Sequence, residues 1–177
     1  MKIKIRILIT ILITTFITSS VHAESAKSYF DEAVLATKTK TALIGEKNVS
    51  AGSINVEVSK DIIQLSGFVG SDAEIAAALA TAEKVEGAKE VLNALVVFSG
   101  SRTQDEAADD ATISAKLKTE LAKVEGLGSA TDIIITIRLG QVLLAGFVKS
   151  EIVKTSAGEV AKGISGVKKV HNLIAVK

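Results

Sequence analysis

The sequence contains no cysteine, so the chain can form no disulfide and offers no thiol nucleophile. It also contains no tryptophan, and its one tyrosine and five phenylalanines leave few aromatic side chains for deep insertion into a membrane. The two histidines, His22 and His171, are too few for a histidine-rich metal site. The composition therefore predicts a protein with no catalytic residue, no metal site and no cofactor, whose small domains are held together by packing alone.

The start of the chain has the three-part layout of a secretory signal peptide. Lys2, Lys4 and Arg6 precede an apolar run over residues 7–17, and the sequence SSVHA then places a valine and an alanine at the −3 and −1 positions of a cleavage site. The run of 11 residues is shorter than the roughly 20 that cross a bilayer, which favours a cleaved signal peptide over residues 1–23 rather than an uncleaved membrane anchor. No transmembrane segment is expected after cleavage, and without a cysteine the mature chain is not expected to be lipidated.

The rest of the chain consists of two copies of one unit. The segment AEKVEGAKEVLNALVV, residues 82–97, aligns without a gap with AKGISGVKKVHNLIAV, residues 161–176. The offset between the copies is 79 residues here and 78 in the first predicted helix, which indicates one inserted residue in a loop. The repeat predicts a first unit over residues 29–98, a linker over residues 99–106 and a second unit over residues 107–177.

Within each unit the hydrophobic period changes in the order helix, strand, strand, helix, strand. Three strands and two helices predict an α+β unit, and alternation along the strands places both helices on one face of a three-stranded sheet. The same alternation places Gly67 and Gly146 on the helix-facing side, where a helix with small residues such as Ala82 or Ala161 can approach the sheet closely. Six residues at matching positions are predicted to be architectural: Gly67, Gly146, Gly87, Gly166, Asn93 and Asn172.

Two motifs in each unit resemble those of the BON domain family. One is a glycine inside an apolar strand, in IIQLSGFV (62–69) and in VLLAGFV (142–148). The other is the tail V-E-G-A-x-x-V-x-N-x-L-x-V at residues 85–97, which returns as I-S-G-V-x-x-V-x-N-x-I-x-V at residues 164–176. The resemblance covers nearly all of the chain after residue 23 and combines an export signal with two such units.

This resemblance implies a non-enzymatic periplasmic protein of the Gram-negative cell envelope. The family is associated with phospholipid binding, with the response to osmotic stress and with the integrity of the envelope. The implied partners are anionic phospholipid head groups, contacted peripherally, or other envelope proteins. The alternative function that the resemblance implies is a periplasmic chaperone for outer-membrane or secreted client proteins.

The charge of the chain is divided unevenly between the units. Residues 31–99 carry six cations and ten acids, net −4, whereas residues 109–177 carry ten cations and seven acids, net +3. The second unit is therefore the better candidate for contact with anionic head groups, whereas the near-neutral total argues against nucleic-acid binding. The predicted lipid or partner surface, called the lysine surface below, consists of Lys116, Lys118, Lys123, Lys149, Lys154, Lys162, Lys168 and Lys169. A solvated face is the alternative, since Lys116 and Lys123 have helical spacing to Glu120 and can pair with it.

The face of each sheet away from the helices, called the open face below, is the second candidate surface. It is predicted to carry the apolar side chains of Phe68, Phe147, Leu143 and Ile134. An apolar patch of this kind marks an interface. Packing of the two units against each other is the favoured interpretation, and binding of a client or of lipid is the alternative.

Two pairs of neighbouring carboxylates, Asp31-Glu32 and Asp109-Asp110, lie where the first helix of each unit is predicted to begin. Acids in a first helical turn interact favourably with the helix dipole. Both pairs are therefore interpreted as charges at helix starts rather than as a metal or acid–base site. His171 is interpreted as a residue of a sheet face rather than as a ligand.

Overall fold

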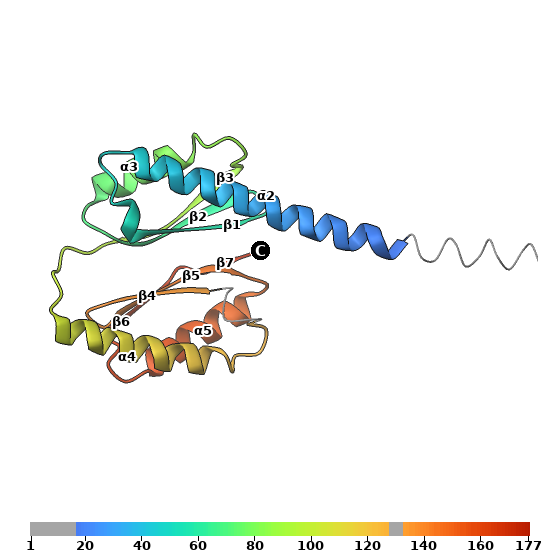
Figure 1. Cartoon of the computed structure of the whole chain (residues 1–177). Coiled ribbons are helices and arrows are strands. Elements are labelled where there is room, and N and C mark those ends of the chain that lie inside the picture. Colours follow the sequence, from blue (N-terminus) through green and yellow to red (C-terminus); the bar gives the residue numbers. More distant parts are fainter. Residues whose placement is uncertain (1–16, 128–132) are drawn as a thin grey trace, which may run out of the picture.

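The computed structural model describes residues 17–127 and 133–177, so residues 1–16 of the predicted signal peptide lie outside the described residues. The first unit contains α2 (Ile17–Gly45), the 3-10 helix η1 (Ala51–Ser53), β1 (Ile54–Ser59), β2 (Ile62–Val69), α3 (Asp72–Ala82) and β3 (Glu90–Val97). The second unit contains α4 (Gln104–Leu121), β4 (Ile133–Arg138), β5 (Gln141–Val148), α5 (Glu151–Gly163), β6 (Lys169–Asn172) and β7 (Ala175–Val176). The predicted order of elements is confirmed in both units, and the last strand of the second unit is divided in two (Figure 1).

The strands of both units have the same topology. β1 pairs antiparallel with β2, and β2 pairs in parallel with β3. In the second unit β4 pairs antiparallel with β5, which pairs in parallel with β6 and β7. Both residues of each hairpin turn, Lys60-Asp61 and Leu139-Gly140, have a positive φ, which is the two-residue turn that fits the twist of antiparallel strands.

The two units stack as four layers (Figure 1). α2 and α3 cover one face of the first sheet, α4 and α5 cover one face of the second, and the two open faces lie toward each other. Each unit has its own aliphatic core between helices and sheet, one around Ile63 and Leu65 and the other around Val142 and Leu144. Burial of each such side chain contributes roughly 1.5–3 kcal/mol to the stability of its unit.

Gly67 is required by the chain that enters β1 rather than by a helix. Its φ of +145° is one that residues with side chains rarely adopt, and a Cβ atom here would overlap the carbonyl oxygen of Ser53. The prediction that a helix approaches the sheet at Gly67 is therefore wrong. The sequence indicated a close approach at this position, but the approaching group is the backbone of Ser53, the last residue of η1, just before β1.

Gly87 and Gly166 lie in the turns that lead from the second helix of each unit to its last strand. A Cβ atom at Gly87 would lie 3.7 Å from Leu35 Cδ1, and one at Gly166 would lie 3.1 Å from Ile113 Cδ1. Leu35 and Ile113 belong to the first helix of their units. The distance at Gly87 is an ordinary contact, whereas the one at Gly166 is tight, so only Gly166 is needed for the turn to pack closely against the first helix. Both positions also have a positive φ, 101° and 95°, which favours glycine.

The matching asparagines have different roles. The side chain of Asn93 is exposed, and its Oδ1 accepts a hydrogen bond from the Leu95 N–H at 2.9 Å within β3. Asn172 Nδ2 instead donates to the Lys154 carbonyl of α5 at 2.7 Å. Gly158 makes room for it, because a Cβ atom there would lie 2.6 Å from Asn172 Nδ2. Asn172 therefore joins the last strand to α5, whereas Asn93 shapes only its own strand.

Candidate functional site

The lysine surface is concentrated on the helical side of the second unit. Four of its members lie on α4 and α5, the layer farthest from the first unit, and the others lie beside these helices or at the start of β6. Seven of the eight lysines are exposed, and Lys154 is half-buried. The surface is therefore accessible to a partner that approaches from the side opposite the first unit.

Ion pairs within the second unit neutralise part of this surface. Three pairs have a spacing of three residues: Lys123–Glu120 at 2.7 Å, Lys154–Glu151 at 3.9 Å and Lys162–Glu159 at 2.7 Å. Glu120 thus pairs with Lys123 rather than with Lys116. Such exposed pairs add little stability, but each cancels one positive charge. Five lysines form no ion pair within residues 17–127 and 133–177: Lys116, Lys118, Lys149, Lys168 and Lys169.

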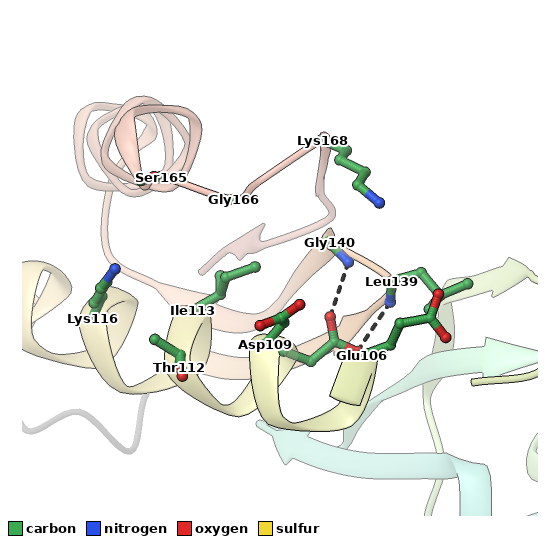
Figure 2. Close-up of a pocket in the computed structure, with 11 residues that line it drawn as sticks. Glu106, Asp109, Thr112, Ile113, Lys116, Leu139, Gly140, Ser165, Gly166 and Lys168 are labelled. Atoms are coloured by element: carbon green, nitrogen blue, oxygen red, sulfur yellow. Dashed lines mark hydrogen bonds between the residues drawn. The ribbon is translucent and has the colours of Figure 1, made fainter. Parts of the chain in front are cut away.

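A pocket of about 360 Å³ lies between α4, the β4–β5 turn and the loop before β6 (Figure 2). Lys116 lines it from α4 and Lys168 from the loop, so the structure brings these two members of the lysine surface together. Glu106 and Asp109 line the same pocket, and Ile113 contributes apolar surface. The pocket therefore combines both signs of charge.

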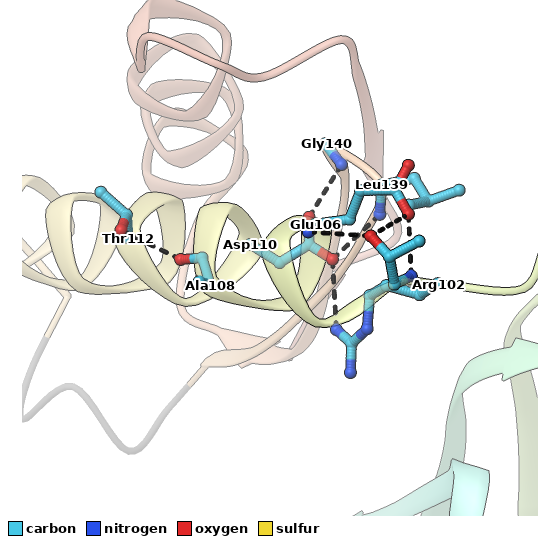
Figure 3. Close-up of polar contacts among 8 residues, drawn as sticks. Arg102, Glu106, Ala108, Asp110, Thr112, Leu139 and Gly140 are labelled. Carbon is cyan, nitrogen blue, oxygen red and sulfur yellow. Dashed lines mark hydrogen bonds and ion pairs between the residues drawn. The ribbon is translucent and has the colours of Figure 1, made fainter.

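Asp110 joins α4 to the β4–β5 turn (Figure 3). Its carboxylate is 4% exposed and accepts hydrogen bonds from the backbone N–H groups of Leu139 at 3.0 Å and Gly140 at 2.9 Å. The guanidinium of Arg102 donates a third at 3.1 Å. A buried carboxylate with charge-assisted bonds of this kind fixes the turn against the helix.

The predicted role of the acidic pairs at helix starts is wrong. α4 begins at Gln104, inside the predicted linker, with Thr103 and Glu106 as its capping box, so Asp109-Asp110 lie further along the helix. Hydrogen bonds from Thr103 lower the pKa of Glu106. α2 extends back to Ile17, so Asp31-Glu32 also lie inside a helix.

Glu32 has the same role in the first unit as Asp110 has in the second. Its Oε1 accepts a hydrogen bond at 2.9 Å from the N–H of Lys60, in the β1–β2 turn. The offset of 78 residues matches Glu32 with Asp110, and the offset of 79 matches Lys60 with Leu139. The repeat alignment was the signal that could have identified these turn anchors.

The two open faces bury each other. Phe68 is 3% and Phe147 is 6% exposed, Leu143 is fully buried and Ile134 is half-buried. The Phe68 ring meets Phe98 edge-on at 5.6 Å between centroids, and it meets His171 of the second unit edge-on at 6.2 Å. The four apolar residues of the predicted interface therefore lie on sheet faces turned toward the other unit.

Two titratable side chains lie on these faces. Burial raises the pKa of Glu57 on β1. Burial, together with the charge of Lys169, lowers the pKa of His171, whose Nε2 lies 3.1 Å from Gln141 Oε1. Both shifts disfavour the charged form, as expected for groups enclosed between two sheets.

Gln64 connects the two sheets through its side-chain amide. Its Oε1 accepts a hydrogen bond from the Gly146 N–H of β5, and its Nε2 donates at 2.9 Å to the Leu173 carbonyl between β6 and β7. The amide thus lies between two backbone groups of the second sheet at the point where its last strand is interrupted. Asn55 Nδ2 adds a second polar contact between the units, to Thr136 Oγ1 at 3.4 Å.

The described residues contain neither a membrane-spanning helix nor a cluster of metal ligands. No helix in that part of the chain combines the length and the apolar character that a membrane crossing needs. No three histidine, aspartate or glutamate side chains within residues 17–127 and 133–177 are placed to hold a metal ion together.

Comparison with known proteins identifies the repeated unit. The model of the BON domain matches residues 31–98 and 109–177. The chain is 30% identical over 152 residues to "Osmotically-inducible protein Y" of Escherichia coli strain K12, covering 85% of this chain and 75% of that protein. It is 30% identical over 141 residues to "Outer membrane lipoprotein DolP" of Haemophilus influenzae, covering 79% of this chain and 72% of that protein.

A structure of CdsD, a structural protein of the type III secretion system of Chlamydia trachomatis, aligns with 80% of this chain and 91% of that one, at 10% identity and a TM-score of 0.35. The two matches to the family model cover most of the sequence, and the chain therefore belongs to the BON domain family.

Proposed function

We propose that the protein is a non-enzymatic component of the periplasmic cell envelope that contacts anionic phospholipid surfaces through its second BON unit. The observation that carries this proposal is the group of five lysines without an ion pair among the described residues. All five side chains are exposed, and Lys116 and Lys118 project from α4, in the layer farthest from the first unit. Lysines placed in this way are attracted to an anionic membrane surface within about a Debye length.

The relatives support the envelope part of the proposal. One is named for osmotic induction and the other as an outer membrane lipoprotein. The proposal takes the predicted signal peptide as the signal that directs the chain out of the cytoplasm. Contact through exposed lysines is peripheral and electrostatic. The proposed role is in osmotic stress and envelope maintenance.

Cosedimentation of the full mature chain with lipid vesicles tests this proposal. The chain is expected to bind phosphatidylglycerol vesicles at low salt, to bind phosphatidylcholine vesicles weakly, and to be released by high salt. A triple variant, Lys116→Gln, Lys118→Gln and Lys168→Gln, is expected to bind on the order of a hundredfold more weakly, because each lysine near an anionic surface contributes about 1 kcal/mol.

The matched control removes three charges from the first unit, at the exposed residues Lys38, Lys47 and Lys84. This control is expected to keep nearly all of the binding. Absence of binding to anionic vesicles at low salt, or an equal loss in both triple variants, would contradict the proposal.

The alternative function, a chaperone that binds a client on the open face, requires Phe68 or Phe147 to be accessible. Both side chains are buried between the two sheets. A client could reach them only after the units had separated, so the structure favours lipid contact over client binding.

A further inference from the structure

A second pocket lies where the two units and the linker meet, and we propose that it binds an oxyanion of the phosphate class. Its volume is about 290 Å³, and its lining comes from η1, β1, β2, the linker and β4. Arg102 of the linker and Arg138 at the end of β4 both line it. These are the only two arginines after residue 6 of the sequence. The site is separate from the lysine surface and does not depend on it.

Arg138 supplies a donor that the protein itself leaves unused. Its Nε is buried and has no hydrogen-bond partner among the described residues. Its guanidinium carbon lies 5.7 Å from the centre of the Phe98 ring, a cation–π contact that positions the group without accepting its N–H bonds. A buried donor without an acceptor is costly. The guanidinium that carries it lines the pocket, where an oxyanion would lie against its terminal N–H groups.

Arg102 is held in place by one side of its guanidinium. One terminal nitrogen donates to Asp110 at 3.1 Å, and 38% of the side chain is exposed. Figure 3 shows the guanidinium extending from the linker, with its other terminal nitrogen directed away from Asp110. The planar fork of a guanidinium matches carboxylate and phosphate oxygens, so Arg102 has donors left for a ligand.

The rest of the lining favours an anion over a cation. Ser53 and Thr136 contribute hydroxyl groups, and Asn55 contributes a side-chain amide. No acidic residue is found among the described residues that line this pocket. Two guanidinium groups surrounded by neutral donors form a site for a compact oxyanion with several acceptor oxygens, which is the chemistry of phosphate.

The repeat indicates that the fold itself does not need Arg138. The offset of 79 residues matches Arg138 with Ser59, which ends β1 in the first unit as a buried neutral residue. The same strand therefore ends without a charge in one unit and with a guanidinium in the other. Because the pocket is lined by both units, a bound oxyanion joins them at the edge of their interface.

A titration of the full mature chain with inorganic phosphate, at constant ionic strength and followed by NMR, tests the proposal. Saturable shifts are expected for the backbone amides of Asn55, Thr136 and Arg138. Arg138→Gln is expected to weaken phosphate binding about tenfold or more, because a charge-assisted hydrogen bond is lost. Arg102→Lys keeps a cation for Asp110 but loses the planar fork, so a smaller loss is expected.

The control is Lys149→Gln, which removes an exposed charge that does not line the pocket and should leave phosphate affinity unchanged. Circular dichroism checks that each variant is folded. The proposal is overturned if no saturable shifts occur, or if Lys149→Gln weakens binding as much as Arg138→Gln.

A second arm identifies the source of the phosphate group. Phosphatidylglycerol vesicles are added to the phosphate-loaded chain that carries the triple substitution of Lys116, Lys118 and Lys168. Displacement of phosphate from the pocket indicates a lipid head group, whereas retention indicates a soluble phosphate compound. Vesicle binding by the lysine surface is measured separately, so failure of either proposal leaves the other standing.

Discussion

In the first unit β3 pairs with β2 without a break from Glu90 to Val97, whereas in the second unit the corresponding strand is divided into β6 and β7. The amide of Gln64 lies at the interruption, between Gly146 N–H and the Leu173 carbonyl. In the first unit the residues matching these two, Gly67 and Ala94, belong to the continuous ladder. Residue 143, which matches Gln64, is a leucine and cannot form such bonds. In the second unit, the interruption of the last strand thus coincides with the contacts of one polar side chain from the first unit.

The units also differ in how they use carboxylates. Asp110 is buried and has three donors, whereas Glu32 in the matching position is half-buried and accepts one hydrogen bond from the turn. Conversely, Glu74 is buried in the first unit, and the matching residue of the second unit is Val153. Each unit therefore relies on a carboxylate at a different place.

The largest expected effect comes from the aromatic contact between the units. Phe68→Ala is expected to lower the free energy of unfolding by about 4 kcal/mol, and Phe147→Ala by about 3 kcal/mol. The difference arises because the Phe68 ring packs edge-on against Phe98 and His171, and such pairs contribute about 1 kcal/mol beyond burial. Urea unfolding of both variants measures the two free energies of unfolding. A larger loss for Phe147→Ala than for Phe68→Ala would contradict the stabilising role of the edge-on contacts.

The turn anchors give the next comparison. Asp110→Ala is expected to cost about 3 kcal/mol, because it leaves Arg102 and two backbone N–H groups without their acceptor. Glu32→Ala is expected to cost less than about 1 kcal/mol, because its single bond is exposed to water. Denaturant unfolding of the two variants separates these values. Equal costs would show that the extra donors of Asp110 add nothing.

The contacts of the Gln64 amide are tested by replacing it with leucine, the residue at the matching position 143 of the second unit. Gln64→Leu is expected to cost about 2 kcal/mol, because it leaves Gly146 N–H and the Leu173 carbonyl without a side-chain partner. Hydrogen exchange at the Gly146 amide should become faster in this variant. Gln104→Leu, at an exposed position, is the matched control and should change neither quantity. Unchanged exchange at Gly146 in Gln64→Leu would contradict the bridging role.

The smallest effect is a difference in acid sensitivity. Burial alone would raise the pKa of Glu74, but hydrogen bonds from the N–H groups of Gly70 and Ser50 outweigh it and lower the pKa. The ionised Glu74 therefore stabilises the first unit above its unfolded pKa, and this contribution is lost as the pH falls through its lower folded pKa. Glu74→Gln is expected to be about 1–2 kcal/mol less stable than the wild type at neutral pH and to approach it in acid. Urea unfolding of both proteins at neutral and at acidic pH measures the difference in the free energy of unfolding. A difference that stays the same at both pH values would contradict the prediction.

The repeat pattern was sufficient for the architecture, because hydrophobic period, hairpin spacing and turn glycines are local signals that occur twice. Contacts between the units were not predictable in the same way. Gln64 is one polar residue on an alternating strand. Nothing in the sequence around it predicts a contact with Gly146, which lies 82 residues later in the chain. The repeat alignment matches the turn anchors Glu32 and Asp110 with each other. The sequence interpretation nevertheless places both at helix starts, whereas α2 and α4 begin earlier in the chain. Arg138 carried no signal, since its pocket exists only when the units are stacked.

The contacts of Gln64 also make the two units depend on each other unequally. The first sheet uses only its own strands, so it can be completed by the part of the chain that is synthesised first and, if a signal peptide guides it, exported first. The second sheet is completed at Gly146 and Leu173 only when β2 is already in place to offer its amide. The earlier half of the chain therefore supplies two hydrogen-bond partners that the later half needs, whereas the ladder of the first sheet is formed within its own unit.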